Sequence, residues 1–284
     1  MKKEFILASS KLFSTENLDL AYQTQNFSFY CDQPERIIKI SEDKSLYFDG
    51  YVLPKLSVDN RFKTLDSISL IESLINFYGN EFIHQIKGRY VIIIFHNNTF
   101  RLYNDQLGVY KVFYYQDHSG FYVSSRMHLI KKGVKLSISP SSLVHYCLLN
   151  NFIDGQTAFT GVYTLLPGSV CTNENIQLIF ERYFHYSSLL SEEQAILTWE
   201  ELTTSLTELA KTYFKFCSSS NHYLTLTGGM DSRLLLAIHH KMKQKPVILN
   251  YGNPSSMDAM VSKRLAKKLN LRYVNLGIVD TISG

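Results

Sequence analysis

The stretch "YLTLTGGMDSRLLLA", Tyr223–Ala237, decides how the second part of the chain is interpreted. It begins with a short alternating apolar run, continues through Gly228, Gly229, an acid and a hydroxyl, and ends in a leucine-rich run. Glycines let backbone amides approach an anion closely, and the amides at the start of a helix carry partial positive charge. The pattern therefore predicts a phosphate-binding turn between a strand and a helix.

The side chains around the two glycines extend this prediction. The hydroxyls of Thr227 and Ser232 suit phosphate oxygens, whereas Asp231 would repel phosphate unless a cation stood between them, which predicts Mg²⁺. The usual P-loop is excluded, because no Gly-Lys-Ser/Thr follows four spacer residues. A plain turn followed by an Asp-Ser helix cap is the structural alternative. We favour a nucleotide site because strand, glycines, acid and hydroxyls occur together.

Strands and helices alternate around this turn. Strands are expected over 223–227, 246–252 and 272–278, with helices over 232–243 and 257–269. Such alternation predicts a parallel sheet with right-handed crossovers.

The character of the sequence changes near Ser187. Beyond it, "SEEQ" at Ser191–Gln194 fits a capping box, and apolar residues at helical spacing from Ile196 to Tyr213 predict one helix. We therefore expect two domains, 1–187 and 188–284.

The first domain is rich in predicted strands. Hairpin turns are expected at Asn97-Asn98 and over 117–120. A helix that begins near Ser67 is expected to stop at Gly79, and a second covers 141–149. Because strands and a few helices occur without a strand–helix–strand rhythm, the pattern favours an α+β sandwich.

Composition excludes several functional classes. The net charge is +4 without a basic block longer than two lysines, so nucleic acid is not an expected partner. The four cysteines are scattered without the short spacing of a metal site or a disulfide framework. With neither a signal peptide nor an apolar run long enough to span a bilayer, the expectation is a cytoplasmic protein that does not bind membranes.

Several motifs resemble one family. "LTGGMDS" is similar to the pyrophosphate loop of ATP pyrophosphatases, and "NYGNPSSMD" at 250–258 resembles a Gly-x-Pro-x-Ser-x-Asp turn of asparagine synthetases. "NDQLGVYKVFYY" at 104–115 and "FTGVYTLLPGSVCT" at 159–172 resemble segments of their N-terminal domain. The resemblance covers nearly the whole chain. It implies an Ntn-type αββα sandwich, glutamine-amidotransferase-like, followed by an incomplete α/β parallel-sheet PP-loop domain.

The resemblance also implies ATP and Mg²⁺ as cofactors, and a set of site residues. Asp231 and Ser232 would be catalytic, with Asp231 on the metal side. The implied ATP contacts are Leu226, Thr227, Gly228, Gly229, Tyr251 and Gly252. The implied reaction, as in asparagine biosynthesis, activates a carboxylate by adenylation with release of pyrophosphate, after which an amine or ammonia attacks. The carboxylate substrate would be aspartate, a peptide or another small acid.

The chain departs from this family at the glutamine-hydrolysing site. Lys2 stands where a cysteine would follow the initiator methionine, and Cys31 is expected to be structural. Ser67 and Ser69 replace two acids, and "FDGY" at 48–51 replaces Asn-Gly-Glu. We therefore expect no glutaminase activity from this chain itself.

The family's synthetase domain continues past the equivalent of Gly284. We therefore expect this sequence to be a fragment of a longer protein, or to be completed by a second chain, with a homodimer as another possibility. Two functional alternatives stay open. One is a peptide or antibiotic cyclase of the same family, and the other is a non-catalytic scaffold or ATP-binding fragment.

Overall fold

The computed structural model describes residues 4–9, 17–55, 57–190, 198–216 and 222–277. The chain divides into two compact units, Met1–Glu193 and Gln194–Gly284, called here the N-terminal and C-terminal units.

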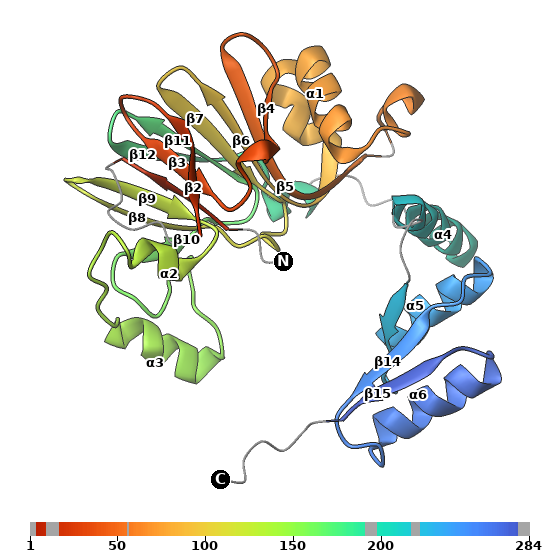
Figure 1. Cartoon of the computed structure of the whole chain (residues 1–284). Coiled ribbons are helices and arrows are strands. Elements are labelled where there is room, and N and C mark those ends of the chain that lie inside the picture. The colour runs from red at the N-terminus through yellow and green to blue at the C-terminus, as the bar shows by residue number, and fades with distance from the viewer. Residues whose placement is uncertain (1–3, 10–16, 56, 191–197, 217–221, 278–284) are drawn as a thin grey trace. The chain divides into compact units, whose positions relative to one another are not determined.

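Two six-stranded antiparallel sheets form the N-terminal unit (Figure 1). The first runs in the order β10 (Val162–Thr164), β8 (Phe113–Asp117), β9 (Gly120–Ser124), β1 (Phe5–Ala8), β3 (Ser28–Cys31), β2 (Asp19–Gln23). The second runs β12 (Gln177–Arg182), β11 (Ser169–Glu174), β7 (Thr99–Asn104), β6 (Ile86–His96), β5 (Lys44–Pro54), β4 (Ile37–Lys39). The expected mixture of antiparallel strands with a few helices is confirmed.

Side-chain alternation along the strands builds the layers. In β1, Phe5 and Leu7 belong to the apolar core shared by the two sheets, whereas Ile6 and Ala8 pack with Leu129 of helix α2 (Met127–Ile130). In the second sheet, inward side chains join the shared core and outward ones pack against helix α1 (Ser67–Tyr78). Because successive strand residues point to opposite faces, each sheet has one face toward the other sheet and one toward a helix.

Local sequence signals set the helix and turn boundaries. Asp66 begins α1 by accepting hydrogen bonds from the amides of Ile68 and Ser69, and α1 ends at Gly79, whose φ is 57°. Asn97, with a φ of 52°, lies in the turn between β6 and β7, which confirms the first predicted hairpin. The second hairpin, β8–β9, is also confirmed. The other described helices of the N-terminal unit are α3 (Pro140–Leu149) and the 3-10 helices at Pro34–Arg36, Asn60–Phe62, Gly79–Gln85 and Tyr186–Leu190.

The C-terminal unit holds a three-stranded parallel sheet in the order β13 (Tyr223–Thr225), β14 (Val247–Tyr251), β15 (Tyr273–Leu276). Helices α5 (Met230–Lys241) and α6 (Met257–Lys268) connect these strands, and α4 (Trp199–Phe216) precedes them. Leucines of β13 and α5 pack with Ile248 and Ala266 in its core. The predicted parallel alternation is therefore present.

The start of helix α5 differs from the expected one. Helix α5 begins at Met230, so Asp231 lies in its first turn and not in the preceding loop. The described part of α4 begins at Trp199, where the Glu201 carboxylate accepts from the Thr198 amide and the Glu201 amide donates to the Thr198 hydroxyl. This is a capping box, and the predicted "SEEQ" box lies outside the described residues.

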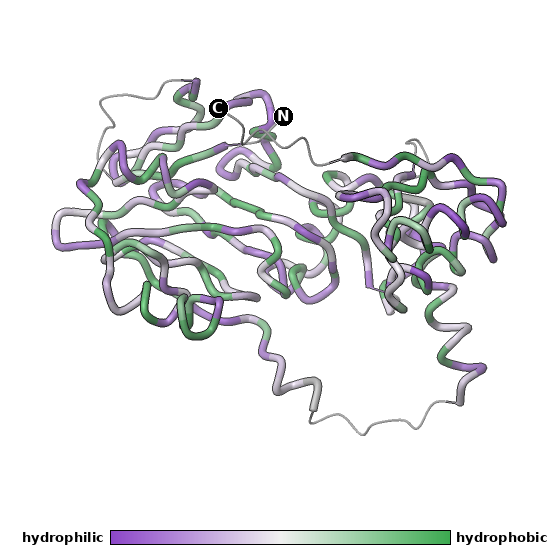
Figure 2. Tube along the Cα trace, turned by 90° about the horizontal axis from the view of Figure 1, so that it is seen from below, coloured by the Kyte–Doolittle hydropathy of each residue, from purple (hydrophilic) through white to green (hydrophobic). Residues whose placement is uncertain are grey.

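Hydrophobic and hydrophilic segments are interspersed along the trace of both units (Figure 2). Among the described helices, none combines the length and apolar character needed to span a bilayer.

His239 of α5 makes the C-terminal unit sensitive to acid. Its ring is buried and lies 4.4 Å, between centroids, from Phe214 and 5.6 Å from His222. Burial, followed by the nearby His222, lowers the pKa of His239 below its ordinary value of 6.5. Because the pKa of His239 is lower in the folded unit, the unfolded chain binds more protons below pH 6.5. The free energy of unfolding of the unit therefore decreases as the pH falls.

We therefore expect amide hydrogen exchange in α5 and β13 to accelerate relative to the N-terminal unit when the pH falls from 7.5 to 5.5, after correction for intrinsic exchange rates. In His239→Phe the ring contact with Phe214 is kept while the titrating group is removed, so this difference should disappear. An unchanged difference in the variant would contradict the assignment.

Candidate functional site

Residues 226–232 lie at the carboxyl end of the parallel sheet, beside the turn that follows β14. In open parallel sheets, ligands bind at this end of the strands. The two segments are joined by a hydrogen bond of 2.8 Å from the Gly228 amide to the Asp258 carboxylate. The structure therefore brings together the two motifs that sequence analysis singled out.

Both predicted phosphate-binding hydroxyls take part in hydrogen bonds within the loop. The Thr227 amide donates to the Ser232 hydroxyl at 3.2 Å, and the Gly229 amide donates to the Thr227 hydroxyl at 3.1 Å. The two hydroxyl oxygens are 3.1 Å apart. These contacts fold the loop back onto the first turn of α5, so the hydroxyls and the glycine amides lie in one small region.

The start of α5 has the properties of an anion site. Gly229 is its N-cap residue and supplies no side-chain acceptor for the first-turn amides. Amides at a helix start lack partners within the helix, and the helix dipole favours negative charge there. A Cβ added to Gly229 would lie 3.2 Å from the Thr227 hydroxyl, which is a tight contact. Asp231 lies exposed in the same turn. These donors are chemically suited to a phosphate, and the exposed Asp231 carboxylate lies in the same turn.

Leu226 and Tyr251, two of the implied ATP contacts, differ in accessibility. Leu226 is fully buried; its amide donates to the Leu249 carbonyl, and its carbonyl accepts from Asn250 and Ser262. Tyr251 at the end of β14 is 60% exposed. Only Tyr251 therefore offers a free side-chain surface to a ligand.

Gly252 follows Tyr251 with a φ of 94°, a conformation that favours glycine. Its amide donates to the Leu276 carbonyl at 3.1 Å, which ties the end of β14 to β15. Gly252 therefore shapes the backbone next to Tyr251.

Three residues of this region had no predicted role. Asn250 and Ser262 are buried polar residues, and both donate to the Leu226 carbonyl, at 2.9 and 2.6 Å. Asp258 accepts from Gly228. The available signal was polarity at positions where the pattern predicts burial: Asn250 interrupts an apolar strand, and Ser262 follows Asp258 by one helical turn.

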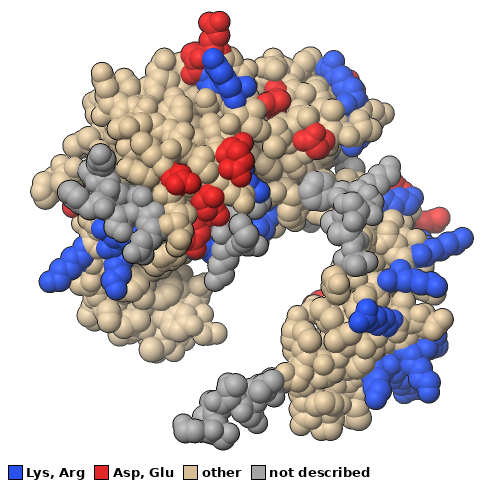
Figure 3. Space-filling model, in the orientation of Figure 1, with Lys and Arg blue, Asp and Glu red and all other residues tan. Residues whose placement is uncertain are grey.

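Basic side chains gather on one side of the C-terminal unit (Figure 3). Helix α6 alone carries Lys263, Arg264, Lys267 and Lys268, against Asp258 as its one acid. A basic surface of this kind raises the local concentration of polyanions.

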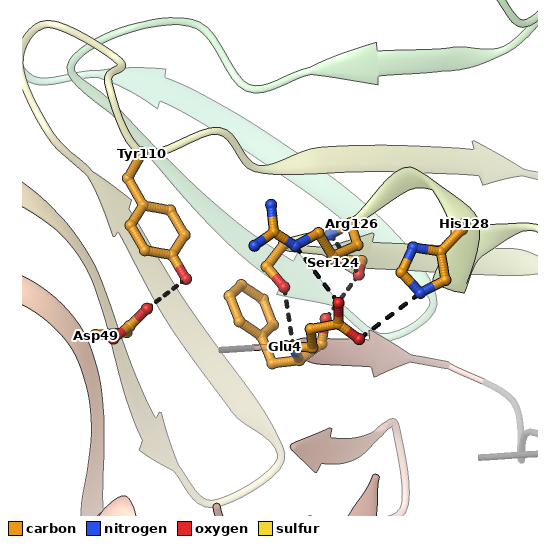
Figure 4. Close-up of polar contacts among 8 residues, drawn as sticks. Glu4, Asp49, Tyr110, Ser124, Arg126 and His128 are labelled. Atoms are coloured by element: carbon orange, nitrogen blue, oxygen red, sulfur yellow. Dashed lines mark hydrogen bonds and ion pairs between the residues drawn. The ribbon is translucent and has the colours of Figure 1, made fainter. Parts of the chain in front are cut away.

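In the N-terminal unit, a polar cluster surrounds the start of β1 (Figure 4). The Glu4 carboxylate lies 3.6 Å from Arg126 and 3.7 Å from His128. The backbone of Phe5 donates to the Ser125 hydroxyl at 3.0 Å and accepts from the Ser124 hydroxyl at 2.6 Å. The beginning of β1 is therefore held by side chains from the end of β9 and the start of α2.

Asp49 of the "FDGY" segment is 4% exposed and paired with groups of its own unit. It accepts from the Tyr110 hydroxyl at 2.7 Å and from Arg36 at 3.1 Å. Burial, followed by the Asp49 charge, raises the pKa of Tyr110, so the phenol stays protonated and donates. Both Asp49 oxygens are thus occupied by internal partners.

Ser67 and Ser69, at positions where the resemblance leads us to expect acids, have structural contacts. The Ser67 hydroxyl accepts from the Val52 amide at 3.2 Å, and the Ser69 hydroxyl donates to Asp66 at 2.6 Å. Both residues therefore help to fix the start of α1.

The two buried thiols of the described chain are poor nucleophiles. Burial raises the pKa of Cys31 to about 11 and also raises that of Cys171. Because the thiolate is the reactive form, both remain protonated and unreactive at neutral pH. The expectation that Cys31 is structural agrees with this environment.

The similarity to solved structures is weak. A glutamine phosphoribosylpyrophosphate amidotransferase from B. subtilis, complexed with ADP and GMP, gives a TM-score of 0.36 at 10% identity, covering 96% of this chain and 59% of that one. A structure titled as the allosteric regulatory enzyme of purine biosynthesis gives 0.37 at 11% identity, covering 99% and 60%. This chain thus spans about 60% of the length of each. These scores establish no shared overall fold.

Sequence comparison gives a more specific result for the N-terminal unit. No curated protein matches the chain. One protein-family model does match a segment, which begins within β5 and ends just past β12. This segment contains α1, the strand sequence "RYVIIIF" and the segments 104–115 and 159–172. Residues 52–184 match the family of the glutamine amidotransferase domain.

Proposed function

We propose that this chain is an asparagine-synthetase-like, ATP-dependent amide-forming ligase that lacks glutaminase activity of its own. The observation that carries the proposal is the Gly228–Gly229 turn at the uncapped start of α5, with two hydroxyls and Asp231 beside it. The glutamine amidotransferase match over residues 52–184 supports the family, because such domains accompany amide-forming chemistry.

Each part of the loop has a distinct task in this proposal. The amides of Gly228 and Gly229 and the Ser232 hydroxyl hold phosphate oxygens, and Asp231 binds Mg²⁺. Tyr251 offers its exposed ring to the adenosine. Bound Mg²⁺–ATP supplies an α-phosphorus that a carboxylate can attack. Fixed amide dipoles and the metal-binding acid then stabilise charge that grows on the leaving pyrophosphate, which is electrostatic catalysis.

The N-terminal unit acts as a scaffold in this proposal. Its buried thiols are protonated, Asp49 is saturated by Arg36 and Tyr110, and Ser67 and Ser69 carry no charge for the α-amino group of glutamine. Ammonia or an amine therefore serves as the nitrogen donor, delivered without glutamine hydrolysis by this chain.

The test is ATP–pyrophosphate exchange by the full-length natural protein, offered aspartate and a panel of peptide and small-molecule acids with Mg²⁺. We expect exchange that depends on one class of acid and stops when EDTA removes the metal. Amide formation should proceed with ammonia, while glutamate release from glutamine stays at the level without protein. Release of glutamate at the rate of amide formation would contradict the scaffold assignment.

The same assay separates the alternatives. Exchange with a peptide or an unusual acid instead of aspartate would identify a cyclase-type ligase. Binding of ATP without pyrophosphate exchange for any acid would identify a non-catalytic ATP-binding protein.

A further inference from the structure

Asp258 places a negative charge on the loop that the proposed function assigns to phosphate. Its Oδ1 atom accepts from the Gly228 amide at 2.8 Å. A Cβ added to Gly228 would lie 3.1 Å from this same oxygen, so the carboxylate is seated against the glycine backbone. An internal anion thus already uses a donor that an incoming phosphate oxygen would need.

Partly buried polar contacts fix the position of the exposed Asp258. Ser256 caps α6 by accepting from the Ala259 amide, which places Asp258 in the first turn. The Ser262 hydroxyl lies 2.5 Å from the Asp258 carbonyl and 2.6 Å from the Leu226 carbonyl. Helix α6 is therefore attached to the end of β13, and its first turn presents the carboxylate to the loop.

The charge of Asp258 has no ionic partner in the described part of the chain. None of the ion pairs among these residues includes it, and the cations of α6 begin at Lys263, more than one helical turn further along. Its hydrogen-bonding partner is the neutral amide of Gly228. A phosphate brought to this amide would meet an unneutralised like charge.

We propose that Asp258 regulates the nucleotide site as an internal competitor. It occupies the Gly228 amide when no nucleotide is bound and must release it when a phosphate oxygen arrives. This inference rests on the proposed function. It adds that the affinity for Mg²⁺–ATP is set below the level that the loop amides could provide, and that the turn over 253–258 moves when nucleotide binds.

The decisive experiment is calorimetric titration of Mg²⁺–ATP into the full-length protein and its Asp258→Asn variant. Asparagine keeps the shape and an acceptor oxygen but removes the charge. We expect the Kd to fall about tenfold, as for loss of one partly screened like charge near the ligand. Glu208→Gln is the matched control, because it removes the same charge from a residue that pairs with Lys211 and not with the loop. Its Kd should stay within twofold of the wild type.

The outcomes distinguish failure of the proposed function from failure of the competitor role of Asp258. If the wild-type protein and Asp258→Asn both fail to bind Mg²⁺–ATP, the proposed function fails, and the competitor role fails with it. If the wild type binds and Asp258→Asn binds equally or more weakly, the competitor role alone is wrong. Asp258→Ala, which also removes the acceptor, provides a second reading, because it too should bind more tightly if Asp258 competes. Hydrogen exchange over α6 verifies that both variants are folded.

Discussion

Replacing Asp231 by alanine is expected to reduce ATP–pyrophosphate exchange by about 100-fold or more while the fold is retained. Asp231 is the exposed acid in the first turn of α5, two residues after the N-cap glycine. No described hydrogen bond or ion pair depends on its carboxylate, so its removal costs little stability. In the proposed function, its loss leaves the pyrophosphate charge without the acid assigned to the metal.

Three variants distinguish this effect from a general loss of charge. Asp231→Asn keeps the shape but removes the charge, and it should lose nearly as much exchange as alanine does. Glu208→Gln, which removes a negative charge elsewhere in the C-terminal unit, should retain exchange. Amide hydrogen exchange over α5 is measured in each variant to verify that it is folded. Turnover within twofold of wild type in both Asp231 variants would show that the metal is bound elsewhere or not used.

The parts of the fold that could be predicted from sequence are those with local causes. Asn97 tolerates a positive φ and lies between two alternating runs, so the β6–β7 hairpin follows from a few neighbouring residues. Gly79 similarly ends α1, because it adopts a φ of 57° directly after a helical apolar pattern. The parallel sheet follows from the same logic, since alternating strands and helices have few stable arrangements.

The parts that could not be predicted depend on residues distant in sequence. Gly228 and Asp258 are 30 residues apart, and only packing of α6 against the end of β13 brings them together. The sequence also predicts the start of α5 two residues too late, because Gly229 as N-cap makes no side-chain bond that a sequence pattern could reveal. The contact between the Thr227 and Ser232 hydroxyls could not be predicted either, because it depends on the backbone geometry of the loop.

The "FDGY" segment at 48–51 has an environment that the structure reveals and the sequence does not. From the sequence, the resemblance to asparagine synthetases only leads us to expect other residues at this position. The structure shows what occupies the place: Asp49 is buried and bonded to Arg36 and Tyr110. Asp49 therefore forms an internal ion pair with Arg36 that links β5 to neighbouring elements of the N-terminal unit. Gly50, which follows Asp49, allows β5 to approach β6 closely at this point.

Replacing Gly50 by alanine is expected to destabilise the N-terminal unit by about 3 kcal/mol or more. Gly50 has a φ of +112°, and an added Cβ would lie 2.1 Å from the Arg89 carbonyl oxygen. The clash is with the backbone of β6, directly opposite in the β5–β6 pairing, so no side chain can rotate to relieve it. Hydrogen exchange over β5 and β6 in the full chain measures the loss.

Gly79→Ala separates the two causes of that loss. Gly79 also has a positive φ, +57°, but an added Cβ would meet nothing within 4 Å. Its substitution therefore carries the conformational cost alone, about 1–3 kcal/mol, and the remainder in Gly50→Ala reflects mainly the close approach of β5 and β6. Equal losses of unfolding free energy in both variants would show that β5 and β6 can move apart at Gly50 without cost. Asp49 would then not be held in place by strand pairing, and its bonds to Arg36 and Tyr110 would have to position it unaided.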